Sequence, residues 1–443
     1  MPKFNTSTPS GFPEFSPAQE SVRQSWMNII RNTYHKYGYL TIETPLVERE
    51  ENLLGKGGNP KEIYVLKRLH DSDNDTSHSG NALRFDQTVP LALYVARHQN
   101  DIAFPFKRQV IGPVFRGERA QKGRFRQFYQ CDIDVIGMEN LPLMYDAEMV
   151  SIINEIFSQF DIGKFIVKIN NRKTLTGFFA GLGIPEDKIK PVLDIVDDLE
   201  KMPTDVIQKH FKDQGIAEHK IKKILTFTAI KGTPNEVLKQ VATMSDHEIF
   251  QTGMSELRQV IQGIEGFGVP EANYQVDLSI ARGLDYYTGT VYETKLVDNP
   301  HFGSVVGGGR YADLAKVFTG KSMPGVGISI GLTRLLSQCF EAGLVMAEKS
   351  SPSQILIVTT DPGYEPRAIT IGQQLRTSGL VVENYFGDRK LAKKFRYGEK
   401  AGIPYVAVIG ESEMANNTVT LKNMETGEQN EMNVEEISHK LRL

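Results

Sequence analysis

Residues 281–290 read Ala-Arg-Gly-Leu-Asp-Tyr-Tyr-Thr-Gly-Thr and lead directly into the strand-like run Val-Tyr-Glu-Thr-Lys at 291–295. This stretch sets Asp285 and two tyrosines between Gly283 and Gly289, with Arg282 directly before them, at a place where a buried strand is normally apolar. Taken alone, it has two interpretations. One is an edge strand on which Arg282 and Asp285 form an ion pair, and the other is a site that holds a charged ligand.

A cation-rich hairpin is predicted further upstream, where the segments 114–119 and 121–128 connect two strands. Like charges repel across a hairpin, so this density of Arg and Lys favours a bound anion such as a triphosphate or an RNA backbone. An exposed basic hairpin without a ligand is the alternative. The strand that follows, 129–134, alternates so that Gln130, Asp132 and Asp134 share one face and form the floor of a pocket.

These segments resemble the motifs of the histidyl-tRNA synthetases. The stretch 281–290 is similar to the histidine-specific motif, and Phe115-Arg116-Gly117-Glu118 is similar to the second class II motif, Phe-Arg-x-Glu. The run 324–335, a predicted strand leading into a helix, resembles the third motif. A helix at 19–37 followed by a strand at 39–43 and Pro45 resembles the first motif, so the resemblance spans nearly the whole chain.

The resemblance implies a site for ATP, which would come with Mg²⁺. It assigns Arg116 to the α-phosphate and the amino acid carboxylate, Glu118 to the adenine amino group and Arg124 to the outer phosphates. Arg334 would lie over the γ-phosphate, and Arg282 would bridge the carboxylate and the α-phosphate. Fixed cations suit this reaction, because negative charge develops on phosphoryl oxygens when a carboxylate attacks the α-phosphate.

The resemblance also implies a site for L-histidine, made by Asp86, Thr88, Gln130, Asp134, Tyr287 and Tyr311. Asp86 would supply the counter-charge of the ammonium group and Thr88 a hydroxyl acceptor. A neutral imidazole donates from one nitrogen and accepts at the other, and Tyr287 and Asp134 would provide these two partners. Tyr286 is equally consistent with the core and with the site.

After Leu344 the chain alternates between strands and helices, which predicts a small α/β domain. The turn after its first strand, 359–364, is not glycine-rich, which argues against a dinucleotide site. In position and pattern this region resembles an anticodon-binding domain. Its predicted basic helix, 389–401, would place Lys390, Lys393 and Lys394 on one face, either toward tRNA or simply toward solvent.

The expected fold is an α+β class II synthetase catalytic domain, an antiparallel sheet flanked by helices, with a helical insertion and a C-terminal α/β anticodon-binding domain. The predicted boundaries are 1–170 and 271–345 for the catalytic domain, 171–270 for the insertion and 346–443 for the last domain. In the family the insertion helps to clasp the tRNA acceptor arm, whereas the alternative is a packing subdomain. Gln121 and its loop neighbours would meet the acceptor end of tRNA-His.

Composition bounds these predictions. A net charge of −3 over 443 residues restricts RNA contacts to local patches, and apolar runs are too short for a membrane span. The sequence has only two cysteines and a polar N-terminus, which favours a cytoplasmic protein. Its histidines do not show the spacing of metal ligands, which favours a protein without a resident metal. The resemblance implies a homodimer. The main rival is the family's regulatory paralogue, which typically lacks the C-terminal domain and the histidine motif.

Overall fold

The structure is a computed structural model that describes residues 4–54, 60–68, 80–121, 123–281, 287–312, 316–347, 351–387 and 389–442. It divides into two compact units. Unit 1 comprises Met1–Pro13 and Trp26–Leu344, and unit 2 comprises Glu14–Ser25 and Val345–Leu443. No helix within the described ranges combines the length and apolar character required to cross a bilayer.

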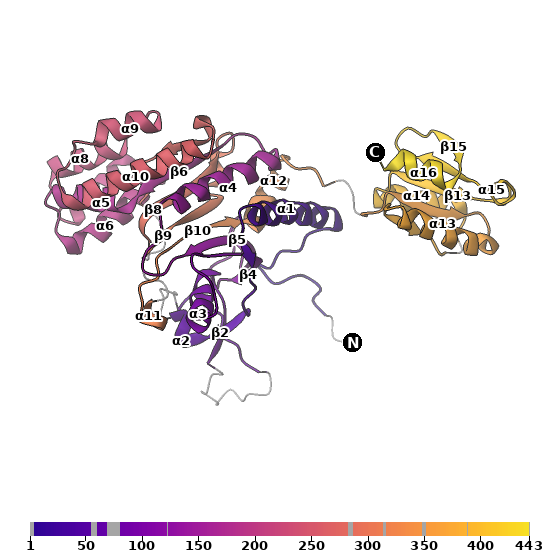
Figure 1. Cartoon of the computed structure of the whole chain (residues 1–443), viewed down its shortest axis with the longest axis horizontal. Helices are drawn as coiled ribbons and strands as arrows, with labels where there is room; N and C mark the ends of the chain where they lie inside the picture. Colours follow the sequence, from indigo (N-terminus) through magenta and orange to yellow (C-terminus); the bar gives the residue numbers. More distant parts are fainter. Residues whose placement is uncertain are drawn as a thin grey trace. The chain divides into compact units, whose positions relative to one another are not determined.

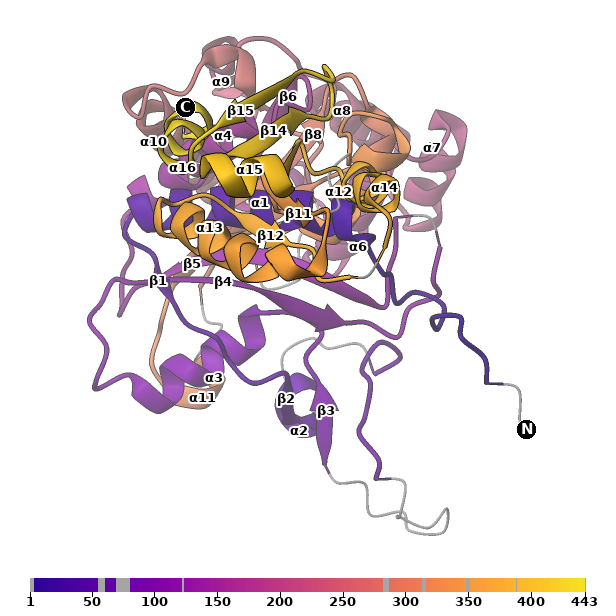
Figure 2. The same cartoon turned by 90° about the vertical axis from the view of Figure 1, so that its right-hand side faces the viewer.

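Unit 1 is built on an eight-stranded sheet with the order β1-β4-β5-β10-β9-β8-β6-β7 (Figures 1 and 2). Its central strands are antiparallel, whereas the edge pairs β1–β4 and β6–β7 are parallel. The sheet is therefore mixed at its edges, where an antiparallel sheet was predicted. Its strands are β1 (Leu40–Thr41), β4 (Phe106–Phe115), β5 (Gln127–Ile136), β6 (Phe165–Asn171), β7 (Tyr274–Val276), β8 (Tyr287–Leu296), β9 (Val306–Tyr311) and β10 (Gly325–Gly331).

One face of this sheet is covered by α4 (Met144–Phe160) and by the part of α1 (Pro17–Lys36) that belongs to unit 1, from Trp26 onward (Figure 1). Trp26 of α1 stacks on Phe160 of α4 with 4.1 Å between ring centroids, and Tyr34 donates to the carbonyl of Cys131 in β5. Alternation along β5 sends Cys131, Ile133 and Val135, all fully buried, to the opposite face from Gln130, Asp132 and Asp134. The helices thus seal the apolar face and leave the polar face for a site.

The sequence pattern of 62–137 predicts strands joined by polar connections, but the region contains the helix α3 (Thr88–His98). Six α3 residues from Val89 to Val95 are buried, and Leu91 and Val95 pack with Phe106 of β4 in one apolar cluster. A helix that is apolar over most of its surface lacks the periodicity that distinguishes it from a buried strand. The small elements are α2 (Glu50–Leu54), α11 (Lys316–Thr319) and a two-stranded antiparallel sheet of β2 (Val47–Arg49) and β3 (Asn81–Leu83).

Between β6 and β7 the chain forms six helices, which we call the helical segment: α5 (Arg172–Gly181), α6 (Glu186–Asp197), α7 (Thr204–Asp213), α8 (Glu218–Thr228), α9 (Pro234–Val241) and α10 (Glu248–Gly266). Phe178 and Phe227 stack at its centre with 4.0 Å between ring centroids. The helices α5 and α10 pack closely, because a Cβ at Gly177 would lie only 2.1 Å from the backbone nitrogen of Phe250.

Unit 2 carries a five-stranded sheet with the order β12-β11-β13-β14-β15. The first three of these are parallel, and β14 and β15 add antiparallel strands. The predicted alternation of strands and helices is present, and β15 is an additional strand that the sequence pattern did not predict. The elements are β11 (Ile355–Thr359), α13 (Glu365–Thr377), β12 (Val382–Asn384), α14 (Leu391–Ala401), β13 (Tyr405–Ile409), α15 (Glu411–Asn416), β14 (Val419–Asn423), β15 (Gln429–Met432) and α16 (Val434–Leu441).

Candidate active site

A cavity of about 1030 Å³ lies in unit 1 against the polar face of the large sheet. It brings together four predicted ATP residues, two predicted histidine residues and Gln121, which is predicted to meet tRNA. These residues of the lining are Arg116, Glu118, Gln121, Arg124, Gln130, Tyr287 and Arg334. They come from separate segments of the sequence, so the fold unites motifs that are far apart along the chain.

Arg116 follows β4 directly and is held on two sides. Its Nε donates to the carbonyl of Phe85 at 3.1 Å, and its guanidinium carbon lies 5.1 Å from the centroid of the Phe128 ring. Stacking and hydrogen bonding restrict the planar group without neutralising it. The side chain lines the cavity with its positive charge fixed in place, as an anion site requires.

Two further arginines line the cavity, one from the hairpin and one from a helix. Arg124 Nη1 lies 3.6 Å from Glu118 Oε2, which joins the two sides of the hairpin between β4 and β5. Arg334, from α12 (Leu332–Glu341), donates from Nη2 to the carbonyl of Phe302 at 2.6 Å. The cavity is therefore bordered by several guanidinium groups and is electropositive on the side of the hairpin.

The floor of the cavity is polar. Gln130 Nε2 donates to Ser329 Oγ at 3.0 Å, between the adjacent strands β5 and β10. Asp132 lies directly opposite Ser329, is 4% exposed, and has no hydrogen-bond partner for Oδ1 among the described residues. Burial raises the pKa of the Asp132 carboxyl to about 7.

Asp134 is the centre of a buried network. Tyr311 donates to its Oδ1 at 3.1 Å, and Arg108 Nη1 lies 3.5 Å from its Oδ2. Burial raises the pKa of Asp134 to about 6, although the charge of Arg108 opposes that rise. Tyr287 and Tyr311 are opposite each other in the β8–β9 register, so three residues predicted for the histidine site, Asp134, Tyr287 and Tyr311, are neighbours.

Glycines make room for these side chains. A Cβ at Gly327 would lie 2.3 Å from Asp134 Oδ1, and one at Gly325 would lie 2.3 Å from the Tyr311 ring. No described atom lies within 4 Å of the position that a Cβ would take at Gly307 or Gly331, and both residues line the cavity. Gly325 and Gly327 therefore allow the side chains of Tyr311 and Asp134 to pack directly against the sheet, and Gly307 and Gly331 leave space for a ligand.

Asp86 and Thr88 lie at the start of α3. Asp86 is 4% exposed, its Oδ1 accepts from the backbone nitrogen of Val89 at 3.1 Å, and Oδ2 has no partner within the described part of the chain. Burial raises the pKa of Asp86. Arg282 and Tyr286 lie outside the described residues, so their assignments stay predictions.

The predicted basic face of α14 needs a correction. Lys390 and Lys393 are exposed, but Lys394 is only 5% exposed, and its Nζ donates to the carbonyl of Thr359 at 2.8 Å. The side chain of Lys394 therefore packs into unit 2, and the prediction that it presents charge to tRNA is wrong. The sequence spacing brings the three lysines close together, with Lys390 directly before α14 and the other two on it, but only Lys390 and Lys393 are exposed.

Several residues of the site carried no prediction from the sequence. Arg108 is fully buried, contacts Asp134 and donates from Nη2 to the carbonyl of Gln87 at 3.3 Å. Ser329 and Glu293 line the cavity. A signal for Ser329 was present, because β10 alternates between apolar residues and Gly325, Gly327, Ser329 and Gly331. Nothing local marks Arg108, whose role follows from its register opposite Asp134.

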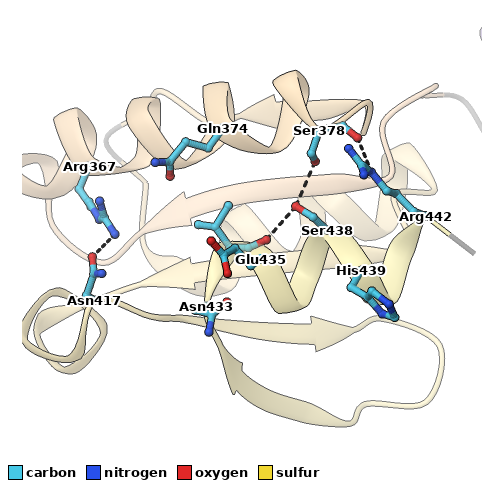
Figure 3. Close-up of a pocket in the computed structure, with 10 residues that line it drawn as sticks. Arg367, Gln374, Ser378, Asn417, Asn433, Glu435, Ser438, His439 and Arg442 are labelled. Carbon is cyan, nitrogen blue, oxygen red and sulfur yellow. Dashed lines mark hydrogen bonds between the residues drawn. The ribbon is translucent and has the colours of Figure 1, made fainter.

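A second cavity, of about 870 Å³, lies in unit 2 between α13 and α16 (Figure 3). Its polar side chains bond largely to one another: Ser378 and Ser438 lie 3.0 Å apart, and Arg442 Nε donates to the carbonyl of Ser378 at 2.6 Å. Arg367 likewise donates to Asn417. This cavity is therefore a groove whose polar groups mostly hydrogen-bond to one another. In unit 1, by contrast, Asp86 Oδ2 and Asp132 Oδ1 have no hydrogen-bond partner among the described residues.

An arginine-bordered cavity on a large mixed sheet, accompanied by a separate α/β unit, defines the architecture of a class II aminoacyl-tRNA synthetase. A family model described as histidyl-tRNA synthetase matches residues 11–335, and one described as anticodon binding domain matches residues 354–442. The chain belongs to the histidyl-tRNA synthetase family. The family and fold class predicted from the motifs are thereby confirmed.

Individual relatives support the same family assignment. The chain is 45% identical over 453 residues to the histidine–tRNA ligase of Nostoc sp. PCC 7120, with 99% of this chain and 98% of the relative covered. It is 46% identical over 428 residues to that of Clostridium tetani, covering 96% and 95%. The crystal structure of the Nostoc histidyl-tRNA synthetase superposes with a TM-score of 0.91 at 45% identity and covers 99% of this chain and all of that one.

Proposed function

We propose that the cavity of unit 1 binds ATP and L-histidine side by side and that histidyl-adenylate forms there, with release of pyrophosphate. As a member of its family the chain is an aminoacyl-tRNA ligase, and the second step transfers histidine to the 3′ end of tRNA-His. The observation that carries the proposal is the convergence of Arg116, Arg124 and Arg334 with Gln130 and Tyr287 on one cavity.

The charge distribution supports an orientation for the two substrates. Phosphates belong on the side of the hairpin, where Arg116 and Arg124 line the cavity, and the amino acid belongs over the polar face of β5, which carries the buried Asp132 and Asp134. Arg116, held by Phe85 and Phe128, would stabilise the charge that develops on the α-phosphate when the histidine carboxylate attacks it. Arg282 is proposed to act on the same oxygens. Mg²⁺ is proposed to enter with ATP as part of that substrate.

Histidine recognition is proposed to use the buried network. The ammonium group would approach Asp86, Thr88 and Gln130, where Asp86 Oδ2 lacks a partner among the described atoms. The imidazole would lie between Tyr287 and Asp134, and Tyr311 would orient Asp134 through its 3.1 Å hydrogen bond. A buried polar pocket of this kind rejects an apolar isostere by about 10⁴-fold, because its own groups would remain unpaired.

For tRNA we propose contacts from Gln121 at the exposed tip of the hairpin, from the helical segment, and from Lys390 and Lys393 of unit 2. The predicted domain boundaries, 171–270 for the insertion and 346–443 for the anticodon-binding domain, remain part of this proposal. A cytoplasmic location and a homodimer are also proposed. The edge strand β1, on which Leu40 is 59% exposed, supports the dimer, because an uncovered apolar edge favours pairing.

The test is ATP–pyrophosphate exchange with each of the twenty amino acids offered singly, followed by charging of tRNA-His. Exchange that depends on histidine alone, with transfer to tRNA-His, is the expected result. Exchange with a different amino acid would contradict the assigned pocket. Silence with all twenty would favour the paralogue that regulates the ATP phosphoribosyltransferase of histidine biosynthesis, which a test of binding to that enzyme would check.

A further inference from the structure

A buried carboxylate outside the cavity links the helical segment to the sheet. Asp277, directly after β7, is fully buried, and its two oxygens lie 2.8 Å from Lys168 Nζ and 2.8 Å from Lys231 Nζ. Lys168 belongs to β6 of the sheet, whereas Lys231 belongs to the helical segment, between α8 and α9. The carboxylate of Asp277 therefore joins two parts of unit 1 through opposite charges.

The network extends through a second acid. Lys168 also lies 2.7 Å from Glu200, which follows α6 in the helical segment, and Glu200 contacts Lys295 of β8. Three of these five charged residues belong to the sheet region and two to the helical segment. Burial alone would raise the pKa of Asp277, but the two lysines lower it well below its ordinary value, so the carboxylate stays charged.

Asp277 also shapes the chain that follows it. Its Oδ1 accepts from the backbone nitrogen of Ser279 at 3.1 Å and from the Ser279 hydroxyl at 2.6 Å. Two further side chains hold the carbonyls of the next residues: Asn170 of β6 donates from Nδ2 to the carbonyl of Ile280 at 2.9 Å, and Arg172 at the start of α5 donates from Nη1 to the carbonyl of Ala281 at 3.2 Å. Arg282, proposed above to act on the phosphate, is the next residue in the sequence.

We propose that Asp277 is a positioning residue for adenylate formation: it fixes residues 277–281, the stem that leads into the histidine motif, and through Lys231 it ties this stem to the helical segment. The proposal rests on the role of Arg282 given above. It does not require Asp277 to touch a substrate. Geometric control of this kind affects the rate of the chemical step more than substrate affinity, because a misplaced cation loses transition-state contacts first.

The experiment uses Lys231→Met in the full-length protein, because the Lys231 side chain is 54% exposed and its replacement leaves the core intact. Lys239→Met, an exposed lysine of α9 in the same segment, is the matched control. We expect Lys231→Met to lower kcat of ATP–pyrophosphate exchange about 5-fold, with KM for ATP and histidine unchanged. Lys231→Arg should restore the rate, and the control should match the parent protein.

A double-mutant cycle with Arg282→Ala tests the route of the effect. If Lys231 acts through Arg282, Lys231→Met causes no further loss in the Arg282→Ala background. Equal losses in both backgrounds, a change confined to KM, or an unchanged kcat in Lys231→Met would each overturn the proposal. Asp277→Asn should lower kcat further than Lys231→Met, because it weakens the contacts to both lysines at once.

The outcomes separate this proposal from the proposed function. Loss of histidine-dependent exchange in the parent protein would remove both. Normal exchange in the parent, a large loss in Arg282→Ala and no effect of Lys231→Met would leave the proposed function standing and remove the positioning role alone. Thermal unfolding of each variant checks that a lower kcat does not come from a smaller folded fraction.

Discussion

The two large sheets use their faces differently, as β5 of unit 1 and β11 of unit 2 illustrate. Strand β11 sends Ile355 and Ile357 to one apolar cluster and Leu356 and Val358 to another, so both of its faces build core. Strand β5 sends Cys131, Ile133 and Val135 to the core but places buried carboxylates on its other face. A buried charge lowers the stability of the fold unless it is paired. The carboxylates on the polar face of β5 therefore indicate a role in ligand binding rather than in stabilising the fold.

The two units contribute different things to the protein. In unit 1 the sheet itself carries the proposed reaction site, and glycines on β9 and β10 leave space for polar groups and for the cavity. In unit 2 the sheet is a scaffold, and exposed groups such as Lys390 and Lys393 lie on a surface helix or directly before it. Changes on the polar face of β5 should therefore impair activity, and changes inside unit 2 should impair stability.

The largest expected effect is on the polar side of unit 1. Arg116→Ala should lower the rate of histidine-dependent pyrophosphate exchange by ~10²- to 10³-fold, about 3–4 kcal/mol, because one fixed cation is lost from the transition state. Arg116→Lys keeps the charge without the planar fork and should recover only part of the rate. Thermal unfolding should be nearly unchanged. A rate close to that of the parent would remove Arg116 from the mechanism.

The next effect tests the scaffold. Leu375 of α13 is fully buried in the cluster that includes Ile355 and Ile357, so Leu375→Ala should destabilise unit 2 by about 3 kcal/mol. Calorimetry should show a lower transition temperature for one unit, while pyrophosphate exchange stays normal because the cavity belongs to unit 1. A parallel loss of exchange would mean that the two units do not divide stability and chemistry as proposed.

A smaller effect concerns the buried carboxylates. The pKa of Asp132 in the fold, about 7, lies above the ordinary value of 3.8, so its protonated form stabilises the fold and this contribution is lost as pH rises through 7. Between pH 6 and pH 8 the free energy of unfolding of unit 1 should fall by roughly 1 kcal/mol from this group. Asp132→Asn should remove that part of the dependence.

Urea unfolding followed by tryptophan fluorescence measures this change. The single tryptophan, Trp26, is buried in unit 1 against Phe160 and reports that unit. An identical pH dependence in the parent protein and in Asp132→Asn would show that the Asp132 carboxyl does not titrate in this range.

The smallest effect is expected on the surface of unit 2. Replacing Lys390 and Lys393 by Ala should weaken tRNA-His binding a few-fold and reduce the slope of its salt dependence by roughly 1 to 2, because two phosphate contacts disappear. Pyrophosphate exchange should not change. Lys394→Met is the contrasting variant: the buried Lys394 bonds to Thr359, so its loss should lower the stability of unit 2 without altering the salt slope.

Regular elements were predicted well from the sequence where periodicity was clear. The helices predicted at 19–37 and 389–401 are present within two residues of the predicted ends, as α1 (Pro17–Lys36) and α14 (Leu391–Ala401). The prediction failed for α3, whose largely apolar surface conceals its helical period, and for β1, which is shorter than predicted. The pattern of alternation also placed Gln130, Asp132 and Asp134 correctly on one face of β5.

The sequence by itself determined the chemistry that is available: its motifs identify the family, and their residue types supply the cations, carboxylates and phenols of the site. Only the tertiary structure decided which of these groups meet. The pairing of β5 with β4 and β10 sets Arg108 and Ser329 beside the acidic floor, and packing of α14 buries Lys394 while Lys390 stays exposed. The physical reason is that local periodicity fixes which side chains share a face, whereas register and long-range packing fix what covers that face.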